Sequence, residues 1–143
     1  MSDFQSRFLP EKANPALREL IARACRWREE PEAFLELVHE DARLRVMGDR
    51  RSNPIYGLHE GRERIRALLA LIGGELGASE VKILNVLVDG ENFAIRRVTE
   101  ARHHGSGASA SLFAGFFVRT REAKVQEIDV YVDTALLDRL ISG

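Results

Sequence analysis

The chain has 143 residues, of which 45% are hydrophobic and 30% charged, a composition typical of one soluble globular domain over residues 1–143. Its net charge of −1 gives no reason to expect nucleic acid or an anionic membrane surface as a partner. No uncharged stretch approaches the roughly 20 residues of a membrane span. The single cysteine, Cys25, cannot form a disulfide within the chain, which favours a reducing compartment such as the cytoplasm.

The N-terminal part predicts two helices behind a short arm. Residues 1–13 show no signal-peptide pattern and are either a flexible arm or an arm that packs over a neighbouring surface. Asn14 followed by Pro15 predicts a helix start, because Asn caps the first turn and Pro fits the first helical position. An apolar stripe continues to Trp27, and Pro31 ends this helix and opens a shorter one.

The middle of the chain predicts one strand and a third helix. The second helix closes at residues 39–41, and residues 42–47 then alternate between apolar and charged side chains. This alternation predicts a strand with one solvated face, at an edge of the sheet. A polar loop and a short irregular piece over 55–59 follow. The third helix is expected over 60–72, where a glycine pair stops it.

Strands dominate the second half of the chain. They are expected at residues 81–88, 93–102, 108–119 and 124–132, joined by short turns in a meander. Large apolar residues occupy both parities of these strands, so both faces of the sheet need cover. A short amphipathic helix follows over 134–142. Helices followed by consecutive strands predict an α+β fold.

Several segments, in this order, resemble the SnoaL-like branch of the nuclear transport factor 2-like superfamily over roughly residues 15–137. The resemblance lies in the paired N-terminal helices and in Glu40-Asp41-Ala42-Arg43-Leu44, Gly57 to Ile65, Leu87 to Gly90, Phe93 to Arg97, and Lys124 to Asp133. It implies a cone, in which a strongly curved antiparallel sheet wraps around the N-terminal helices and leaves a pocket at its open end. It says little about function, because this fold hosts isomerases, cyclases, hydrolases, dehydratases and proteins without chemistry.

The resemblance also predicts which strand residues face the pocket. They are Ile95, Arg97 and Thr99, with His103 as a further candidate; Phe113, Gly115 and Phe117; and Ile128, Val130 and Val132. The opposite parity then forms an apolar outer face with Leu84, Val86, Val88, Val98, Phe116 and Val118. A β-bulge would invert these assignments. The outer face predicts a twofold homodimer with two sheets back to back.

Positions that resemble the catalytic groups of two known enzymes of this fold mostly lack them. For ketosteroid isomerase chemistry, the base position falls on Val46 and the oxyanion-hole Asp position on Gly115. For limonene epoxide hydrolase chemistry, Arg97 matches the Arg, but Val130 and Thr99 stand where the two Asp residues belong. Neither reaction is therefore expected.

Other polar residues remain candidates, each with an alternative. Arg97 would hold a carboxylate or enolate by bidentate contact, unless the strand parity places it in solvent. His103 and His59 are candidate acid–base groups of the kind that SnoaL-type cyclases use, although His103 also fits a solvated turn. Tyr56 either covers the pocket or packs in the core, and Trp27 is either core or pocket wall.

These positions define the predicted site. The catalytic candidates are His103 and His59, and the ligand-binding candidates are Arg97, Thr99, Tyr56, Trp27, Val46, Phe117, Ile128 and Val130. No metal site and no cofactor are expected. Two functions stay open: a cofactor-independent isomerase, cyclase or hydratase acting on an apolar carbonyl-bearing substrate, or a non-catalytic module for ligand binding or dimerisation. A small apolar or carboxylate-bearing ligand is expected as the partner.

Overall fold

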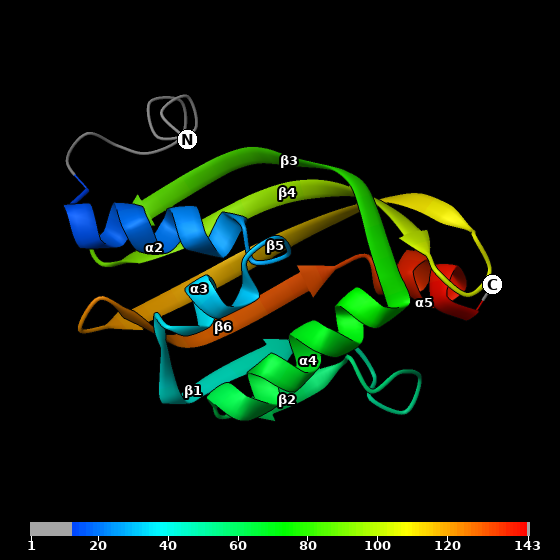
Figure 1. Cartoon of the computed structure of the whole chain (residues 1–143), viewed down its shortest axis with the longest axis horizontal. Coiled ribbons are helices and arrows are strands. Elements are labelled where there is room, and N and C mark those ends of the chain that lie inside the picture. Colours follow the sequence, from blue (N-terminus) through cyan, green and yellow to red (C-terminus); the bar gives the residue numbers. More distant parts are fainter. Residues whose placement is uncertain (1–12, 143) are drawn as a thin grey trace.

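The computed structural model describes residues 13–142, so the predicted arm lies, except for Ala13, outside the described residues. Helices and strands form an α+β fold, in which the last four strands follow one another along the chain (Figure 1). In chain order they are α2 (Pro15–Cys25), α3 (Pro31–Leu35), β1 (Val38–Val46), β2 (Gly57–Glu60), α4 (Arg62–Glu75), β3 (Leu76–Asp89), β4 (Asn92–His103), β5 (Ser109–Arg121), β6 (Lys124–Val132) and α5 (Thr134–Ser142).

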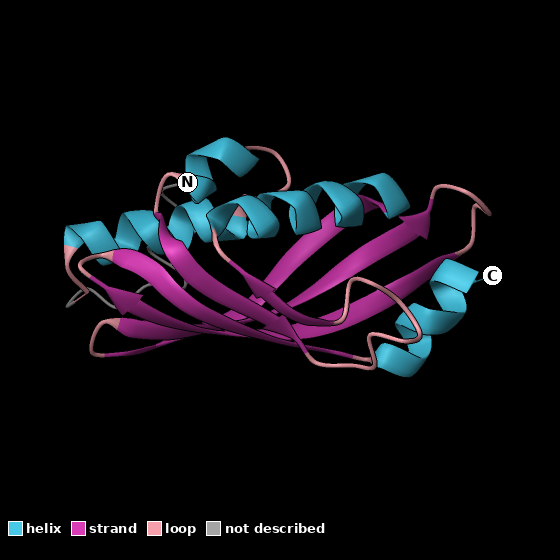
Figure 2. Ribbon diagram, turned by 90° about the horizontal axis from the view of Figure 1, so that it is seen from below, coloured by secondary structure: helices cyan, strands magenta, loops and turns pink. Residues whose placement is uncertain are grey.

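One curved sheet forms the body of the described region. Its six strands lie in the order β2-β1-β6-β5-β4-β3, and all neighbours are antiparallel except β1 and β6. Figure 2 shows α2, α3 and α4 along the concave side of the sheet and α5 at one end. This is the predicted cone. No helix within residues 13–142 has the length and apolar character needed to cross a membrane.

Helix α2 begins as the sequence predicts but ends earlier. The side chain of Asn14 accepts a hydrogen bond from the Leu17 N–H at 2.8 Å, and Pro15 occupies the first turn. The helix ends at Cys25, and residues 26–29 form tight turns, closed by a hydrogen bond from the Glu30 N–H to the Arg26 carbonyl. The prediction of helix up to Pro31 was therefore wrong, and Trp27 lies in a turn.

Strand β1 is longer and more central than predicted. It begins at Val38, so residues 39–41 belong to the strand and do not close a helix. Val38 pairs in parallel with Val125 of β6, which explains the early start. The predicted irregular piece over 55–59 contains most of β2, which pairs with β1 and takes the edge position from it. Gly57, at φ +96°, permits the turn into β2.

The glycine pair does not stop α4. Gly73 and Gly74 lie inside the helix, neither adopts a positive φ, and the chain passes from Glu75 directly into β3. Strand β3 therefore starts at Leu76, five residues before the predicted strand at 81–88. The two glycines lower the propensity of the last helical turn, but the pairing of Leu76 with His103 of β4 fixes where the strand begins.

The register of the sheet assigns each strand residue to a face. One inner row runs through Ile83, Arg97, Ala114 and Val132, and the neighbouring outer row pairs Val98 with Phe113. Two sets of side chains have the predicted orientation. Val98 faces outward, and the inward-facing residues are Ile95, Arg97, Thr99, Ile128, Val130 and Val132.

The parity predicted for β5 was wrong. Leu112, Phe116 and Val118 face inward, whereas Phe113 and Phe117 face outward and are more than half exposed. Gly115 lies in an outer row, between Arg96 and Tyr131. Apolar residues fill both parities of this strand, so only its pairing with β4 fixes the faces.

Part of the β3 assignment was also wrong. A register shift between Ile83 and Asn85 changes the parity, so that Val86 pairs with Ile95 and Val88 pairs with Phe93 on the inner face. Val86 is buried in the core and Val88 packs against it. The bulge that the prediction allowed for thus occurs in β3.

Candidate functional site

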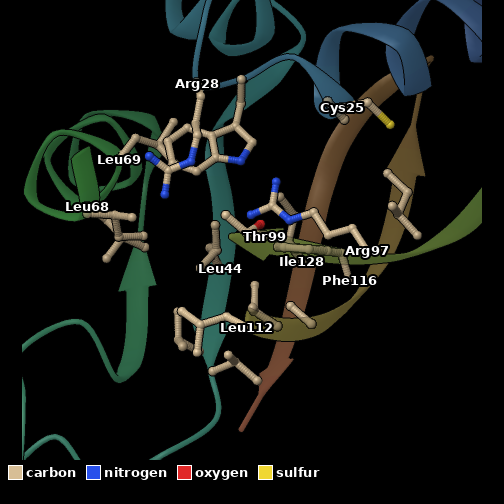
Figure 3. Close-up of a pocket in the computed structure, with 18 of the residues that line it drawn as sticks. Cys25, Arg28, Leu44, Leu68, Leu69, Arg97, Thr99, Leu112, Phe116 and Ile128 are labelled. Carbon is tan, nitrogen blue, oxygen red and sulfur yellow. The ribbon is translucent and has the colours of Figure 1, made fainter. Parts of the chain in front are cut away.

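A cavity of about 140 Å³ lies between the helices and the inner face of the sheet. Its walls come from the end of α2 and the turn after it, from α4, and from the inner rows of the strands (Figure 3). The lining is almost wholly aliphatic and aromatic. Among the described residues, the ionisable side chains that line it are Cys25, Arg28 and Arg97, with no carboxylate, imidazole or phenol.

Arg97 extends from the middle of β4 into this apolar surrounding. Its guanidinium carbon lies 4.5 Å from the centre of the Phe116 ring and 5.8 Å from that of Trp27. Its Nε atom is buried and has no hydrogen-bond partner. Burial, with a smaller effect from the charge of Arg28, lowers the pKa of Arg97 to about 10. The side chain therefore stays cationic at neutral pH.

Arg28 is a second cation at the cavity. It lies in the turn after α2, with its guanidinium carbon 5.0 Å from the centre of the Trp27 ring. One Nη donates to the carbonyl of Leu76 at 3.1 Å, while its Nε is buried without a partner. Burial lowers the pKa of this side chain as well. Helical spacing could have found Arg28, because a helix continued past the end of α2 would place it on the apolar stripe with Ile21 and Ala24.

Cys25 lines the cavity next to these cations. Burial raises the pKa of its thiol to about 12, and the charge of Arg97 opposes this shift only in part. The thiol therefore stays protonated at neutral pH and is a poor nucleophile.

The predicted site residues divide into two groups. Trp27, Val46, Arg97, Thr99, Ile128 and Val130 line the cavity, whereas Tyr56, His59, His103 and Phe117 do not. Phe117 faces outward because of the β5 register. Tyr56 is fully buried, and its hydroxyl donates to Asp138 of α5 at 2.8 Å, so it anchors α5 and does not cover the cavity. Burial and Asp138 together raise the pKa of Tyr56.

Neither histidine candidate lines the cavity, and both have partners elsewhere in the fold. His59 Nε2 lies 2.8 Å from the carbonyl oxygen of Ile55. His103 Nε2 lies 3.0 Å from a carboxylate oxygen of Glu75, and its Nδ1 lies 2.9 Å from the hydroxyl of Ser106. His103 thus ties the β4–β5 turn to the end of α4. Within residues 13–142 no cluster of His, Cys, Asp or Glu is arranged to hold a metal ion.

Solved structures with this architecture are numerous. An NTF2-like protein of unknown function from Burkholderia pseudomallei superposes with a TM-score of 0.79 at 16% identity, covering 91% of this chain and 100% of that one. TerC, crystallised with polyporic acid, superposes with a TM-score of 0.78 at 19% identity, covering 91% of this chain and 100% of that one. A candidate SnoaL-like polyketide cyclase from Jannaschia sp. superposes with a TM-score of 0.73 at 18% identity, covering 94% of this chain and 99% of that one. No curated protein sequence matches significantly.

The curved sheet around helices, with a cavity inside, is therefore the NTF2-like cone fold. The sequence also matches the SnoaL-like domain family over residues 17–128. The chain belongs to the SnoaL-like family.

Proposed function

We propose that the protein binds an apolar small molecule in the cavity and that Arg97 contacts a carbonyl or carboxylate oxygen of this ligand. The observation that carries the proposal is the buried, unpartnered Nε of Arg97 in an otherwise apolar lining. A buried donor without a partner costs free energy, which an acceptor on a ligand would recover. Ligand sites of this kind combine an apolar wall with a few polar groups.

Family membership supports binding of a small molecule, and the crystallisation of TerC with polyporic acid supports the capacity of this fold for such ligands. The cavity lining favours binding without acid–base catalysis, because the described lining residues include no group that exchanges protons near neutral pH. The non-catalytic alternative is thus our first choice.

Acetophenone, an apolar aryl ketone, is a suitable probe. Trp27 is the one tryptophan of the chain and lines the cavity, so its fluorescence should report binding. We expect acetophenone to bind saturably, and Ala114→Leu, which fills the cavity, to weaken binding at least tenfold. Ala94→Leu is the matched control, because Ala94 pairs with outward-facing Phe117. Equal affinities of the two variants, or no saturable response, would contradict the proposal.

An isomerase or cyclase is a second candidate, supported by one feature of the cavity. A cationic Arg97 in apolar surroundings is suited to stabilise the oxygen of an enolate that forms during proton transfer. Exchange of the methyl protons of acetophenone in D₂O, followed by NMR, separates the candidates. Exchange faster than in protein-free buffer, and lost in Arg97→Met, favours the enzyme. A background rate with saturable binding favours the binding protein.

We also propose a homodimer through the outer face of the sheet. The exposed apolar side chains there differ from those predicted: Leu87, Phe113, Phe117 and Tyr131 are 49–64% exposed. Phe117 and Tyr131 pack edge to face, with ring centres 5.5 Å apart. A patch of this kind is typical of an interface. Light scattering at micromolar concentration should give a dimer, and Phe113→Asp should give a monomer. Ala67→Asp, on the exposed surface of α4, is the control; a monomeric parent protein would refute this proposal.

For the place of action, we propose the cytoplasm. The support is the single cysteine of the chain, which is half-buried and unable to form an internal disulfide. Fractionation of cells that express the chain from its own gene tests this proposal. Recovery in an extracytoplasmic fraction would contradict it.

A further inference from the structure

The two cavity arginines are unusual because nothing in the described chain neutralises them. The Nε atoms of Arg28 and Arg97 are buried without acceptors, and no carboxylate within residues 13–142 forms a salt bridge with either side chain. Glu29 lies close enough to act on both pKa values but makes no contact with either guanidinium at salt-bridge distance. Buried charges in proteins are normally paired.

The guanidinium groups of Arg28 and Arg97 lie close to the same side chain, Trp27. Both guanidinium carbons lie within 6 Å of the centre of the Trp27 ring, at 5.0 Å for Arg28 and 5.8 Å for Arg97. The positive charge of Arg28 contributes to the lowered pKa of Arg97, so the two groups repel each other. In Figure 3 Arg97 extends from β4 toward the side of the cavity on which Arg28 lies. An anion at this position would offset the repulsion and supply both missing acceptors.

The free donors and the size of the cavity restrict the anion. A guanidinium has five N–H donors; within residues 13–142 Arg28 uses one Nη for Leu76 and Arg97 uses none, so each arginine keeps its buried Nε and further N–H groups free, enough for each to donate to one oxygen of a carboxylate. The cavity, at about 140 Å³, is close to the roughly 150 Å³ of an engineered apolar cavity that holds benzene. The apolar space therefore suits a single six-membered ring.

We propose that Arg28 and Arg97 form one anion site and that its ligand is a monocyclic aryl carboxylate, with the ring in the cavity and the carboxylate between the two guanidinium groups. This inference rests on the proposed function, because it places the ligand in the same cavity. It adds a charge, a ring count and a second contact residue, Arg28, that the family resemblance did not indicate.

The test compares sodium benzoate with benzamide, a neutral molecule of the same shape, by calorimetric titration at pH 7. We expect benzoate to bind at least tenfold more tightly than benzamide, and this preference to fall as sodium chloride is raised. Benzoate no tighter than benzamide would overturn the inference while leaving the proposed function intact. If neither compound nor acetophenone binds, both the inference and the proposed function fail.

Variants of Arg28 test whether this residue causes the preference for benzoate over benzamide. Arg28→Met should weaken benzoate binding at least tenfold more than benzamide binding, and Arg28→Lys should restore part of the loss because it keeps the charge. Arg26→Met is the matched control, because Arg26 lies in the same turn but is exposed and paired with Glu30. Thermal unfolding of each variant shows that it is folded. Unchanged benzoate affinity in folded Arg28→Met would overturn the role of Arg28.

Discussion

The inner and outer faces of the sheet consist of alternate residues of the same strands, but different groups are left without a partner on each face. On the inner face the apolar side chains are covered by helices, while Arg97, like Arg28 in the turn after α2, forms no salt bridge with a described carboxylate. On the outer face Arg96 donates to the side chain of Asn85, while Phe113 and Phe117 lack cover. The unpaired cations at the cavity thus favour an anionic small molecule as ligand, and the exposed aromatic side chains of the outer face favour contact with an apolar surface.

The largest effect should come from placing a carboxylate on each face of β5. Val118 is 4% exposed on the inner side, and its neighbour Phe117 is 55% exposed on the outer side. Val118→Asp should lower the free energy of unfolding by about 3 kcal/mol or more, because it buries an unpaired charge. Phe117→Asp should cost about 1 kcal/mol or less in dilute solution. Urea unfolding of both variants measures the difference; equal losses would mean that the faces of β5 are assigned wrongly.

This pair of residues also shows how far the sequence alone determines the fold. The cap at Asn14, the apolar stripe of α2 and the turn at Gly90 are local signals, and each element that they predict is present. The faces of β5 carry no local signal, because Leu112 to Val118 is apolar on both parities. Only pairing with β4 settles them, and pairing is a property of the folded sheet.

A second, smaller effect on the free energy of unfolding is expected from replacing one of two neighbouring arginines, Arg96 and Arg97. Arg97 is a desolvated cation whose pKa is lowered from its ordinary value to about 10, whereas Arg96 is exposed. The native state disfavours the charged form of Arg97, so Arg97→Met should raise the free energy of unfolding at pH 7 by about 1–3 kcal/mol. Arg96→Met should change it by no more than about 0.5 kcal/mol. Denaturant unfolding without ligand measures both; destabilisation by Arg97→Met would show that an unrecognised partner holds this cation.

The candidate site was predictable on β4 and β6. Arg97, Thr99 and Val130 face inward in the strand parity that the family resemblance implies, and all of them line the cavity. Arg28 reaches the cavity from the turn after α2, and no proline or glycine in the sequence marks the end of that helix at Cys25. Tyr56 and His59 lie in or beside the irregular segment before α4, where side-chain direction depends on contacts with distant residues such as Asp138. Sequence periodicity carries no information about such contacts.

The smallest effect concerns Cys25, the last residue of α2, which lines the cavity that the inner face borders. Its pKa is raised from 9.0 to about 12, so the folded chain keeps a proton that the unfolded chain loses in this window. The free energy of unfolding should therefore fall as pH rises from 9 toward 12. Between pH 8 and pH 10, the parent protein should lose about 1 kcal/mol more than Cys25→Ala.

Because the chain has one cysteine, the difference between the parent protein and Cys25→Ala isolates this thiol, and the other titrating groups cancel. The charge of Arg97 opposes the shift, but the folded thiol stays protonated between pH 8 and pH 10 with or without that charge, so replacing Arg97 by Met should leave the difference between the two proteins unchanged. Denaturant unfolding at the two pH values is sufficient. Parallel pH profiles would mean that the thiol ionises as freely in the folded chain as in the unfolded one, and that the inner face near Arg97 is open to water.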